Sequence, residues 1–296
     1  MNTYPDPAQS LVDEMQSAAA SAPERTAAFQ GAPGAYSHQA VREMYPGFHS
    51  LPCLDFGGAM DAVVDGRAEV AVIPIENSQH GRVADIHFLL PESGLSITRE
   101  HFVRISHCLL AASGDRTGIT NAYSHPQALG QCRKRLAAWG IEQSPYFDTA
   151  ASAAFVAGER PAGGAAIASE LSAELYGLNI IERAIEDAEH NTTRFVALSR
   201  EGAAAPTDGA LMTTLIFEVR SVPAALFKAL GGFATNGVNL TKLESYMRGG
   251  TFNAAEFYVD IEGHPDDPAT ARALDELSYF SKWVRILGTY EKARDR

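Results

Sequence analysis

The stretch 189-EHNTTRFVALSR-200 places polar side chains directly before a short apolar run. Residues 195–198 are all apolar, which predicts a short strand that is buried on both faces. Asn191, Thr192, Thr193 and Arg194 precede it and carry an amide, hydroxyls and a fixed positive charge. Such residues are common in active sites, where a loop meets a rigid strand. They are also common in plain turns, because Asn and Thr bond to their own backbone. The stretch alone leaves both interpretations open.

From residue 27 onward, short apolar runs alternate with amphipathic stretches. We expect buried strands at 27–31, 70–76, 119–124, 165–169 and 193–199, and helices at 36–45, 57–66, 126–139 and 149–158. This alternation indicates an α/β fold with a largely parallel sheet. The long β-type run at 95–112 is expected to cross between two lobes, with a ligand cleft between them.

The last third of the chain has a different pattern. Residues 201–211 are rich in Ala, Gly and Pro without periodicity, and predict a linker. Beyond it we expect strands at 212–220, 239–247, 254–264 and 283–290, helices at 223–237 and 267–280, and a hairpin connection at 248–253. The order β-α-β-β-α-β is the ferredoxin-like arrangement.

Composition excludes several classes of protein. The 296 residues include 24 basic and 36 acidic ones, a formal net charge of −12, so we expect no nucleic-acid partner. Three scattered cysteines fit reduced thiols in a cytosol and predict no zinc site. The apolar runs are too short for a transmembrane helix. Residues 1–26 lack a basic start and an apolar core, so we expect a mobile or loosely helical arm. We therefore expect a cytoplasmic protein without a membrane partner.

Two motifs follow predicted strands in the first half of the chain. In 29-FQGAPGAYSHQA-40, Ser37 lies where a helix begins, which suits either a bound carboxylate or a simple helix cap. In 74-PIENSQHGRV-83, Glu76 and Asn77 end a strand. They fit a turn, and they also fit a cleft, because open α/β sheets bind ligands at the carboxyl ends of their strands.

Two further motifs lie in the region expected to form the second lobe. In 123-YSHPQALGQC-132, Ser124 ends a strand and fits either a cap or a site, and Gln131 lies two turns into the next helix. The adjacent Ser and His do not indicate a catalytic triad, because neighbours on a strand point to opposite faces and G-x-S-x-G is missing. The small residues of 148-DTAASAAFVAG-158 indicate close helix packing.

Taken together, these motifs resemble the prephenate dehydratases, enzymes of phenylalanine biosynthesis with a C-terminal ACT domain. The resemblance rests on FQGAPGAYSHQA, PIENSQHG, YSHPQALGQC, DTAASAA, AAIAS, YGLNII, NTTRFVAL and NLTKLES, in the family's order. It implies a bilobed catalytic domain at 27–200, similar to type II periplasmic binding proteins, with crossings near 95–112 and 180–192. It also implies a ferredoxin-like ACT domain at 212–291.

The resemblance further implies an activity and its residues. The family dehydrates and decarboxylates prephenate to phenylpyruvate, and needs no metal or other cofactor, because aromatisation drives the reaction. Its catalytic positions fall on Thr193, Asn77, Ser124 and Gln131, and its substrate-binding positions on Arg194, Ser37 and Glu76. Thr193 would donate a proton to the leaving hydroxide. We expect Arg194 and Ser124 to anchor the pyruvyl carboxylate, because an ion pair with the ring carboxylate would stabilise the ground state.

The resemblance also implies regulation by phenylalanine at the ACT domain of a homodimer or homotetramer. The implied effector site comprises Ala225, Leu226, Asn239, Leu240, Glu244 and Ser245. This chain departs from the family pattern at Ala224, where the family has glycine, and at Tyr246-Met247, where it has Arg-Pro. A methyl group at 224 restricts the backbone, so a purely structural dimerisation domain is the alternative.

Two alternatives to prephenate dehydration stay open. The nearer one is arogenate dehydratase, which acts on the transaminated substrate and gives phenylalanine directly. The more distant one is a sensor without catalysis, in which a binding-protein-like cleft is fused to an ACT domain. A proton donor at Thr193 argues against the sensor, because binding alone would not need it.

Overall fold

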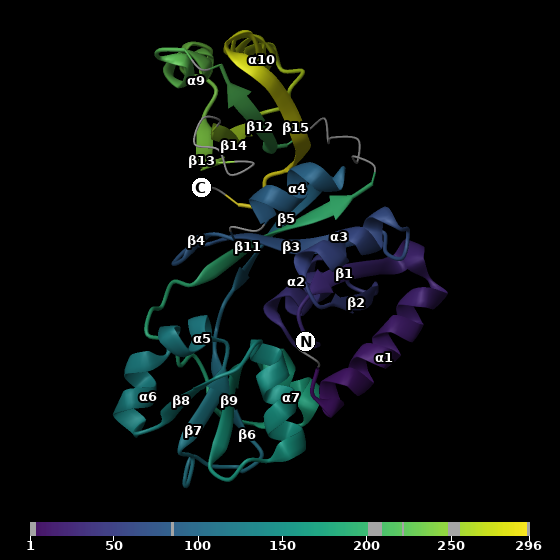
Figure 1. Ribbon diagram of the computed structural model, residues 1–296, viewed down its shortest axis with the longest axis vertical. Helices are drawn as coiled ribbons and strands as arrows, with labels where there is room; N and C mark the ends of the chain where they lie inside the picture. Colours follow the sequence, from purple (N-terminus) through teal and green to yellow (C-terminus); the bar gives the residue numbers. More distant parts are fainter. Residues whose placement is uncertain (1–3, 84–85, 201–208, 221, 248–254, 295–296) are drawn as a thin grey trace. The chain divides into compact units, whose positions relative to one another are not determined.

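The computed structural model describes residues 4–83, 86–200, 209–220, 222–247 and 255–294 (Figure 1). Its contacts divide the chain into two units, one of residues 1–82 and 101–195 and one of residues 83–100 and 196–296. Strands β5 (Ser96–Arg104) and β11 (Thr192–Ser199) each run from one unit into the other. Residues 83–100 and 196–200, which we expected in a catalytic domain at 27–200, therefore group with the C-terminal unit. Most of the expected linker, and the expected hairpin connection, lie outside the described residues.

The first lobe of unit 1 contains the predicted parallel strands. Its elements are β1 (Thr26–Gln30), α2 (Tyr36–Met44), β2 (His49–Cys53), α3 (Phe56–Val64), β3 (Val70–Asn77) and β4 (Gly81–Arg82). The sheet has the order β2-β1-β3-β11-β5, and β4 pairs with β3. Strand β1 is parallel to both of its neighbours. Its residues are buried because α2 and α3 pack against it. The carboxyl ends of β1 and β3 therefore meet at one edge.

The second lobe of unit 1 is a mixed sheet with four helices. Its elements are β6 (Cys108–Ala111), β7 (Asn121–Ser124), α5 (Pro126–Gln131), α6 (Arg133–Trp139), β8 (Glu142–Pro145), α7 (Thr149–Glu159), β9 (Gly164–Ala168), α8 (Glu170–Tyr176) and β10 (Asn179–Glu182). The strand order is β10-β6-β9-β7-β8. Strand β7 is parallel to β8 and β9, and β6 is antiparallel to β9 and β10.

Two predicted elements are interrupted at positions that matter for the site. The run at 95–112 forms β5 and β6, separated by residues 105–107. The helix expected at 126–139 forms α5 and α6, separated at Cys132. Asp187 stabilises this break, because its carboxylate accepts the backbone N–H groups of Lys134 and Arg135 at 3.0 and 3.3 Å. The backbone N–H of Asp187 donates to the carbonyl of Gln131 at 2.7 Å, which fixes the end of α5.

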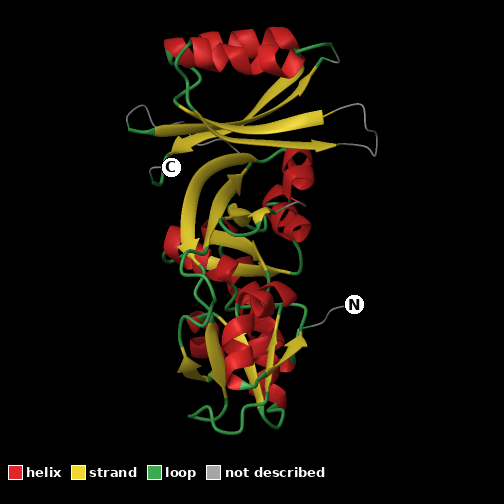
Figure 2. Ribbon diagram, turned by 90° about the vertical axis from the view of Figure 1, so that its left-hand side faces the viewer, coloured by secondary structure: helices red, strands yellow, loops and turns green. Residues whose placement is uncertain are grey.

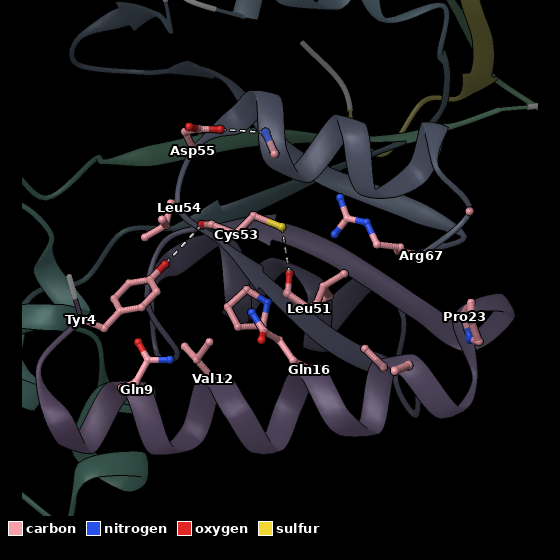
Figure 3. Close-up of a pocket in the computed structure, with 15 residues that line it drawn as sticks. Tyr4, Gln9, Val12, Gln16, Pro23, Leu51, Cys53, Leu54, Asp55 and Arg67 are labelled. Carbon is pink, nitrogen blue, oxygen red and sulfur yellow. Dashed lines mark hydrogen bonds between the residues drawn. The ribbon is translucent and has the colours of Figure 1, made fainter. Parts of the chain in front are cut away.

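The N-terminal segment forms a packed helix, where we had expected a mobile or loosely helical arm. Helix α1 (Asp6–Ser21) packs against β2 and α7, and a short 3-10 turn (Pro23–Arg25) follows it (Figure 1). Ala8, Val12 and Ala19 are its buried residues. A cavity of about 840 Å³ lies between α1 and the β2–α3 region, with Leu51 and Cys53 on its wall (Figure 3).

Unit 2 contains the predicted ferredoxin-like arrangement. Its elements are α4 (Ile86–Ser93), β12 (Leu211–Val219), α9 (Ala225–Thr235), β13 (Leu240–Met247), β14 (Ala255–Glu262), α10 (Pro268–Phe280) and β15 (Ser281–Glu291). The C-terminal sheet has the order β13-β14-β12-β15, and α9 and α10 cover one face of it (Figure 2). Phe217 and Phe257 stack in its core at 5.3 Å. Among the described residues, no helix is both long and apolar enough to cross a membrane.

Candidate active site

The ends of β3 and β11 bring four predicted site residues together as two pairs. These strands are neighbours in the sheet. The Asn77 amide donates to Thr193 Oγ1 at 2.9 Å, and the Arg194 guanidinium contacts Glu76 Oε1 at 3.1 Å. Successive residues on a strand point to opposite faces. The neutral pair therefore occupies one face of the sheet and the ionic pair the other.

The orientation of the Asn77 amide is fixed by the backbone that follows it. Its Oδ1 accepts the backbone N–H groups of Gln79 at 2.9 Å and His80 at 3.1 Å. Its Nδ2 must then face Thr193 and Asn191, and it reaches Asn191 Oδ1 at 2.7 Å. Because Thr193 Oγ1 accepts a hydrogen bond from Asn77, the proton of the Thr193 hydroxyl remains available to a bound molecule.

Arg194 and Glu76 form a partly buried ion pair. The Arg194 side chain is only 1% exposed, whereas Glu76 is 28% exposed. A buried charge is tolerated when a partner of opposite sign compensates it. The guanidinium therefore pairs with a carboxylate of the protein itself. This finding does not favour our expectation that Arg194 anchors a substrate carboxylate.

Gln131 is linked to Asn77 through His80, and on its other side to His107 and Tyr36. Gln131 contacts His80 Nδ1 at 3.2 Å and His107 Nε2 at 2.7 Å. His80 Nδ1 lies 3.3 Å from Asn77 Oδ1, and His107 Nδ1 lies 3.0 Å from the Tyr36 hydroxyl. Burial lowers the pKa of His107 and raises that of Tyr36 well above its ordinary value. Both side chains are therefore uncharged.

The remaining predicted residues of unit 1 lie apart from this hydrogen-bonded group. The Ser124 hydroxyl is fully buried and donates to the carbonyl of Ile167 at 2.6 Å, within the second lobe's sheet. This bond does not favour an anchoring role for Ser124. Ser37 is buried in the first turn of α2. A helix start of this kind offers backbone N–H groups and a partial positive charge to an anion.

The loop before α2 is held in place by side chains of the second lobe. Ser169 and Ser172 both donate to the carbonyl of Gly34, at 2.6 and 3.1 Å, and the Tyr176 hydroxyl donates to Pro33 at 2.6 Å. Gly34 has φ +95°, and a Cβ there would lie 2.6 Å from Ser172 Oγ. Glycine is therefore required for the close approach of these two segments.

Within unit 2, the predicted effector residues lie around the start of α9 and along β13. Ala225 is the first residue of α9, and Leu226 and Leu240 pack against the same core. Asn239 donates to Glu262 at 2.9 Å, Glu244 lies 3.7 Å from Lys242, and Ser245 pairs with Phe257 on β14. Ala224 has φ +61°, a left-handed conformation that glycine adopts more easily.

A cavity of about 840 Å³ lies away from Thr193. It is the groove beside α1, and Figure 3 shows the Tyr4 hydroxyl near the Cys53 carbonyl at its end. Hydrogen bonding and strand geometry instead locate the candidate site where β3 ends and β11 begins. In the described part of the chain, no cluster of three or more His, Cys, Asp or Glu side chains could hold a metal ion.

Sequence reasoning missed three residues of the hydrogen-bonded group, Tyr36, His80 and His107, and it named Asn191 beside Thr193 without assigning it a role. Each lies inside a stretch that the sequence had singled out, or next to a predicted residue. His80 follows Asn77 by three positions, a spacing at which a turn returns a side chain to the amide. No local signal identifies His107, because its role depends on the crossing between lobes.

Comparisons with known proteins identify the relatives of this chain. A family model described as prephenate dehydratase matches residues 27–203. A bifunctional N-acyl-homoserine lactone acylase/prephenate dehydratase of Komagataeibacter europaeus is 51% identical, covering 90% of this chain and 96% of that protein. Arogenate dehydratase/prephenate dehydratase 2 of Arabidopsis thaliana is 38% identical, covering 89% of this chain and 72% of that protein.

A solved structure shares both the fold and part of the sequence. It is prephenate dehydratase from Arthrobacter aurescens in complex with L-Phe, with a TM-score of 0.81 and 32% identity, and the match covers 90% of each chain. This match extends well beyond residues 27–203, so it includes much of the C-terminal sheet. The chain belongs to the prephenate dehydratase family.

Proposed function

We propose that this chain converts prephenate to phenylpyruvate, with loss of water and carbon dioxide. The observation that carries the proposal is the hydrogen bond from Asn77 to Thr193, which leaves the threonine proton free. Hydroxide is a poor leaving group, so the reaction needs a proton donor at the ring hydroxyl. A positioned general acid typically contributes about 10²–10⁴ in rate.

The proposed step balances atoms and charge. The ring C–O bond breaks, and the leaving hydroxyl takes the Thr193 proton to form water. The ring carboxylate leaves as carbon dioxide, and its C–C electron pair enters the ring, which becomes aromatic. Solvent then returns one proton to Thr193. The net reaction consumes prephenate and one proton, and forms phenylpyruvate, carbon dioxide and water.

The two carboxylates of prephenate need different surroundings. The ring carboxylate loses its charge, so an ion pair there would oppose the reaction. The pairing of Arg194 with Glu76 turns that cation away from Thr193, which supports a less charged site for the ring carboxylate. The pyruvyl carboxylate keeps its charge. We assign it to Ser37 and the start of α2, where the helix dipole favours an anion.

The C-terminal sheet supports a regulatory role for unit 2. Its order β-α-β-β-α-β fits an ACT domain, and the relative from Arthrobacter aurescens was solved with L-Phe. We assign L-Phe as the effector of this chain, bound by the start of α9 and β13. We further assign the protein to a cytoplasmic homodimer or homotetramer, as the resemblance to the family implies.

The name of the bifunctional relative raises amide hydrolysis as a second activity. That chemistry needs a nucleophile activated by a base. In unit 1 the Thr193 hydroxyl accepts from an amide, and the Ser124 and Ser169 hydroxyls donate to backbone carbonyls. The geometry therefore supports dehydration best.

Turnover of purified protein with prephenate, arogenate and an N-acyl-homoserine lactone tests the proposal. We expect phenylpyruvate from prephenate, and slower or no phenylalanine from arogenate. Faster conversion of arogenate would keep the chemistry and change the substrate. If neither prephenate nor arogenate were converted, the proposal would be refuted. Added L-Phe is expected to inhibit turnover, and no inhibition would contradict the effector role of unit 2.

A further inference from the structure

A tyrosine–histidine pair lies behind Gln131, with Tyr36 half-buried and His107 buried. Tyr36 opens α2 in the first lobe, and His107 lies on the crossing between β5 and β6. The Tyr36 hydroxyl contacts the Ser106 carbonyl at 2.7 Å and His107 Nδ1 at 3.0 Å, and His107 Nε2 contacts Gln131 at 2.7 Å. His107 is 2% exposed, so water cannot replace a missing partner.

The pair can be satisfied in only one way if His107 is neutral. If Gln131 turns its amide oxygen to His107, then Nε2 carries the ring proton and Nδ1 carries none. The single Tyr36 proton must then serve both Nδ1 and the Ser106 carbonyl. If Gln131 turns its amide nitrogen to His107 instead, Nδ1 carries the proton and donates to Tyr36 Oη. Tyr36 then donates to Ser106, and each contact has one donor and one acceptor.

Both amide orientations fit the same atomic positions, because the oxygen and nitrogen of a glutamine amide are nearly interchangeable in shape. The hydrogen-bond count decides between them. A cationic His107 would also satisfy the contacts, but burial opposes the charge. The Glu186 carboxylate contacts the backbone of His107, whose N–H it accepts at 2.9 Å. The neutral Nδ1–H form with the reversed Gln131 amide is therefore favoured.

This orientation determines whether Gln131 offers a hydrogen-bond acceptor or a donor to His80 in the candidate site. In the structure Gln131 Oε1 faces His107 Nε2, and Gln131 Nε2 lies 3.2 Å from His80 Nδ1. Reversing the amide directs its nitrogen to His107 and its oxygen to His80 Nδ1. His80 must then carry its proton on Nδ1, and this one proton faces both the Gln131 oxygen and Asn77 Oδ1, the latter at 3.3 Å. Because His80 is exposed, unlike His107, water can complete the hydrogen bonds there. A donor at Asn77 Oδ1 polarises the amide that holds Thr193. With the other orientation, His80 presents a lone pair to Asn77.

We propose that Tyr36 and His107 are positioning residues for the reaction at Thr193, because they fix which end of the Gln131 amide faces the site. The inference rests on the proposed role of Thr193 as proton donor. It assigns no contact between Tyr36 or His107 and the substrate. Both residues act through Gln131, so their loss should affect the chemical step more than substrate binding.

The first test needs neither substrate nor a variant. The ¹⁵N chemical shifts of the His107 ring in the wild-type protein report its protonation. We expect a neutral ring with the proton on Nδ1. A proton on Nε2, or an imidazolium at neutral pH, would overturn the inference. Since this test measures no turnover, it fails or succeeds independently of the proposed function.

The second test is a double-mutant cycle on kcat. Tyr36→Phe removes only the hydroxyl, and we expect kcat to fall about tenfold while KM changes less than about threefold. Gln131→Met removes the amide at similar volume. In the Gln131→Met background, Tyr36→Phe should have no further effect on kcat. Effects that multiply in the double variant, or an unchanged kcat in Tyr36→Phe alone, would overturn the inference.

A matched control separates positioning from general damage. Tyr123 packs its ring on Phe155 in the second lobe, at 5.1 Å between centroids. Tyr123→Phe removes a phenol hydroxyl there and should leave kcat unchanged. An equal loss of kcat in Tyr123→Phe and Tyr36→Phe would contradict a specific role for Tyr36.

Discussion

Two pairs of side chains, one residue apart on the same two strands, have opposite characters. Asn77 and Thr193 form a neutral pair whose threonine keeps a free proton. Glu76 and Arg194 form an ionic pair in which the cation is 1% exposed. The strand backbone alone separates the two pairs, because it turns alternate residues to opposite faces of the sheet.

This difference shows that one motif contains both a residue proposed to react and residues that stabilise the strand carrying it. In the Thr-Arg-Phe sequence at 193–195, the threonine offers a proton, the arginine is neutralised inside the sheet, and Phe195 is buried. A charged residue in a family motif is therefore not by itself evidence of substrate contact. In this protein we assign Arg194 to holding β11 against β3, where Asn77 is fixed.

Breaking the neutral pair should have the largest effect on activity. Thr193→Val replaces the hydroxyl with a methyl group at nearly constant volume, so we expect kcat to fall about 10²–10⁴-fold. Thr193→Ser keeps the hydroxyl and should retain most of kcat. Steady-state turnover of prephenate measures both variants. Equal losses in the Val and Ser variants would point to packing rather than proton donation.

Breaking the ionic pair should mainly affect stability. Arg194→Met removes the buried cation from this pair, and solvent partly screens the 28% exposed Glu76 carboxylate, so we expect the free energy of unfolding to fall by about 1–3 kcal/mol. The double variant Arg194→Met/Glu76→Gln removes both charges and should recover most of this loss. Urea unfolding measures each variant. If Arg194→Met kept its stability and only raised KM, the arginine would bind substrate after all.

Much of this arrangement could be predicted from sequence, and the missing part has a physical reason. The strand ending at Asn77 and the strand beginning at Thr192 were both evident from their apolar runs. The pairing of Arg194 with Glu76 was not, because it depends on β3 and β11 being neighbours in the sheet. Sequence order does not show that, since more than a hundred residues separate the two strands.

The same limit applies to Ser124 and to the first 26 residues. The sequence located Ser124 at a strand end, but its hydroxyl bonds to β9, a strand forty-three residues further on. The N-terminal segment has no continuous apolar core, so a packed helix was not expected. Its buried residues are mostly alanines, which pack closely but give a weak periodic signal.

His38 offers an intermediate case, a buried polar group that is kept neutral without an ionic partner. Its ring stacks on Phe29 and its Nδ1 accepts the backbone N–H of Gly34 at 3.1 Å. Burial, with a smaller contribution from Arg42, lowers the pKa of His38 from 6.5 to about 4. The unfolded chain therefore binds more protons between these two values.

Stability should fall as pH drops through this window and be complete above it. We expect His38 to contribute a slope of up to about 1.4 kcal/mol per pH unit between about 6.5 and about 4. Urea unfolding at several pH values measures the slope. His38→Asn keeps an acceptor and does not titrate. The pH slope of its unfolding free energy should therefore be smaller by up to about 1.4 kcal/mol per pH unit, the contribution of one proton. The same slope in both proteins would contradict a neutral buried His38.

Replacing Ala224 should have the smallest effect, and it extends the comparison to the second unit. Gly34 and Ala224 both have positive φ values, +95° and +61°, but only one of them is glycine. An L-residue pays a steric cost in this conformation, whereas glycine loses more freedom on folding. We expect Ala224→Gly to raise the free energy of unfolding by about 0.5–1 kcal/mol.

Ala225→Gly, one residue into α9, is the matched control and should lower the free energy of unfolding by a similar amount. Urea unfolding of the full chain distinguishes them, and a loss of stability in both variants would show that Ala224 carries no backbone strain.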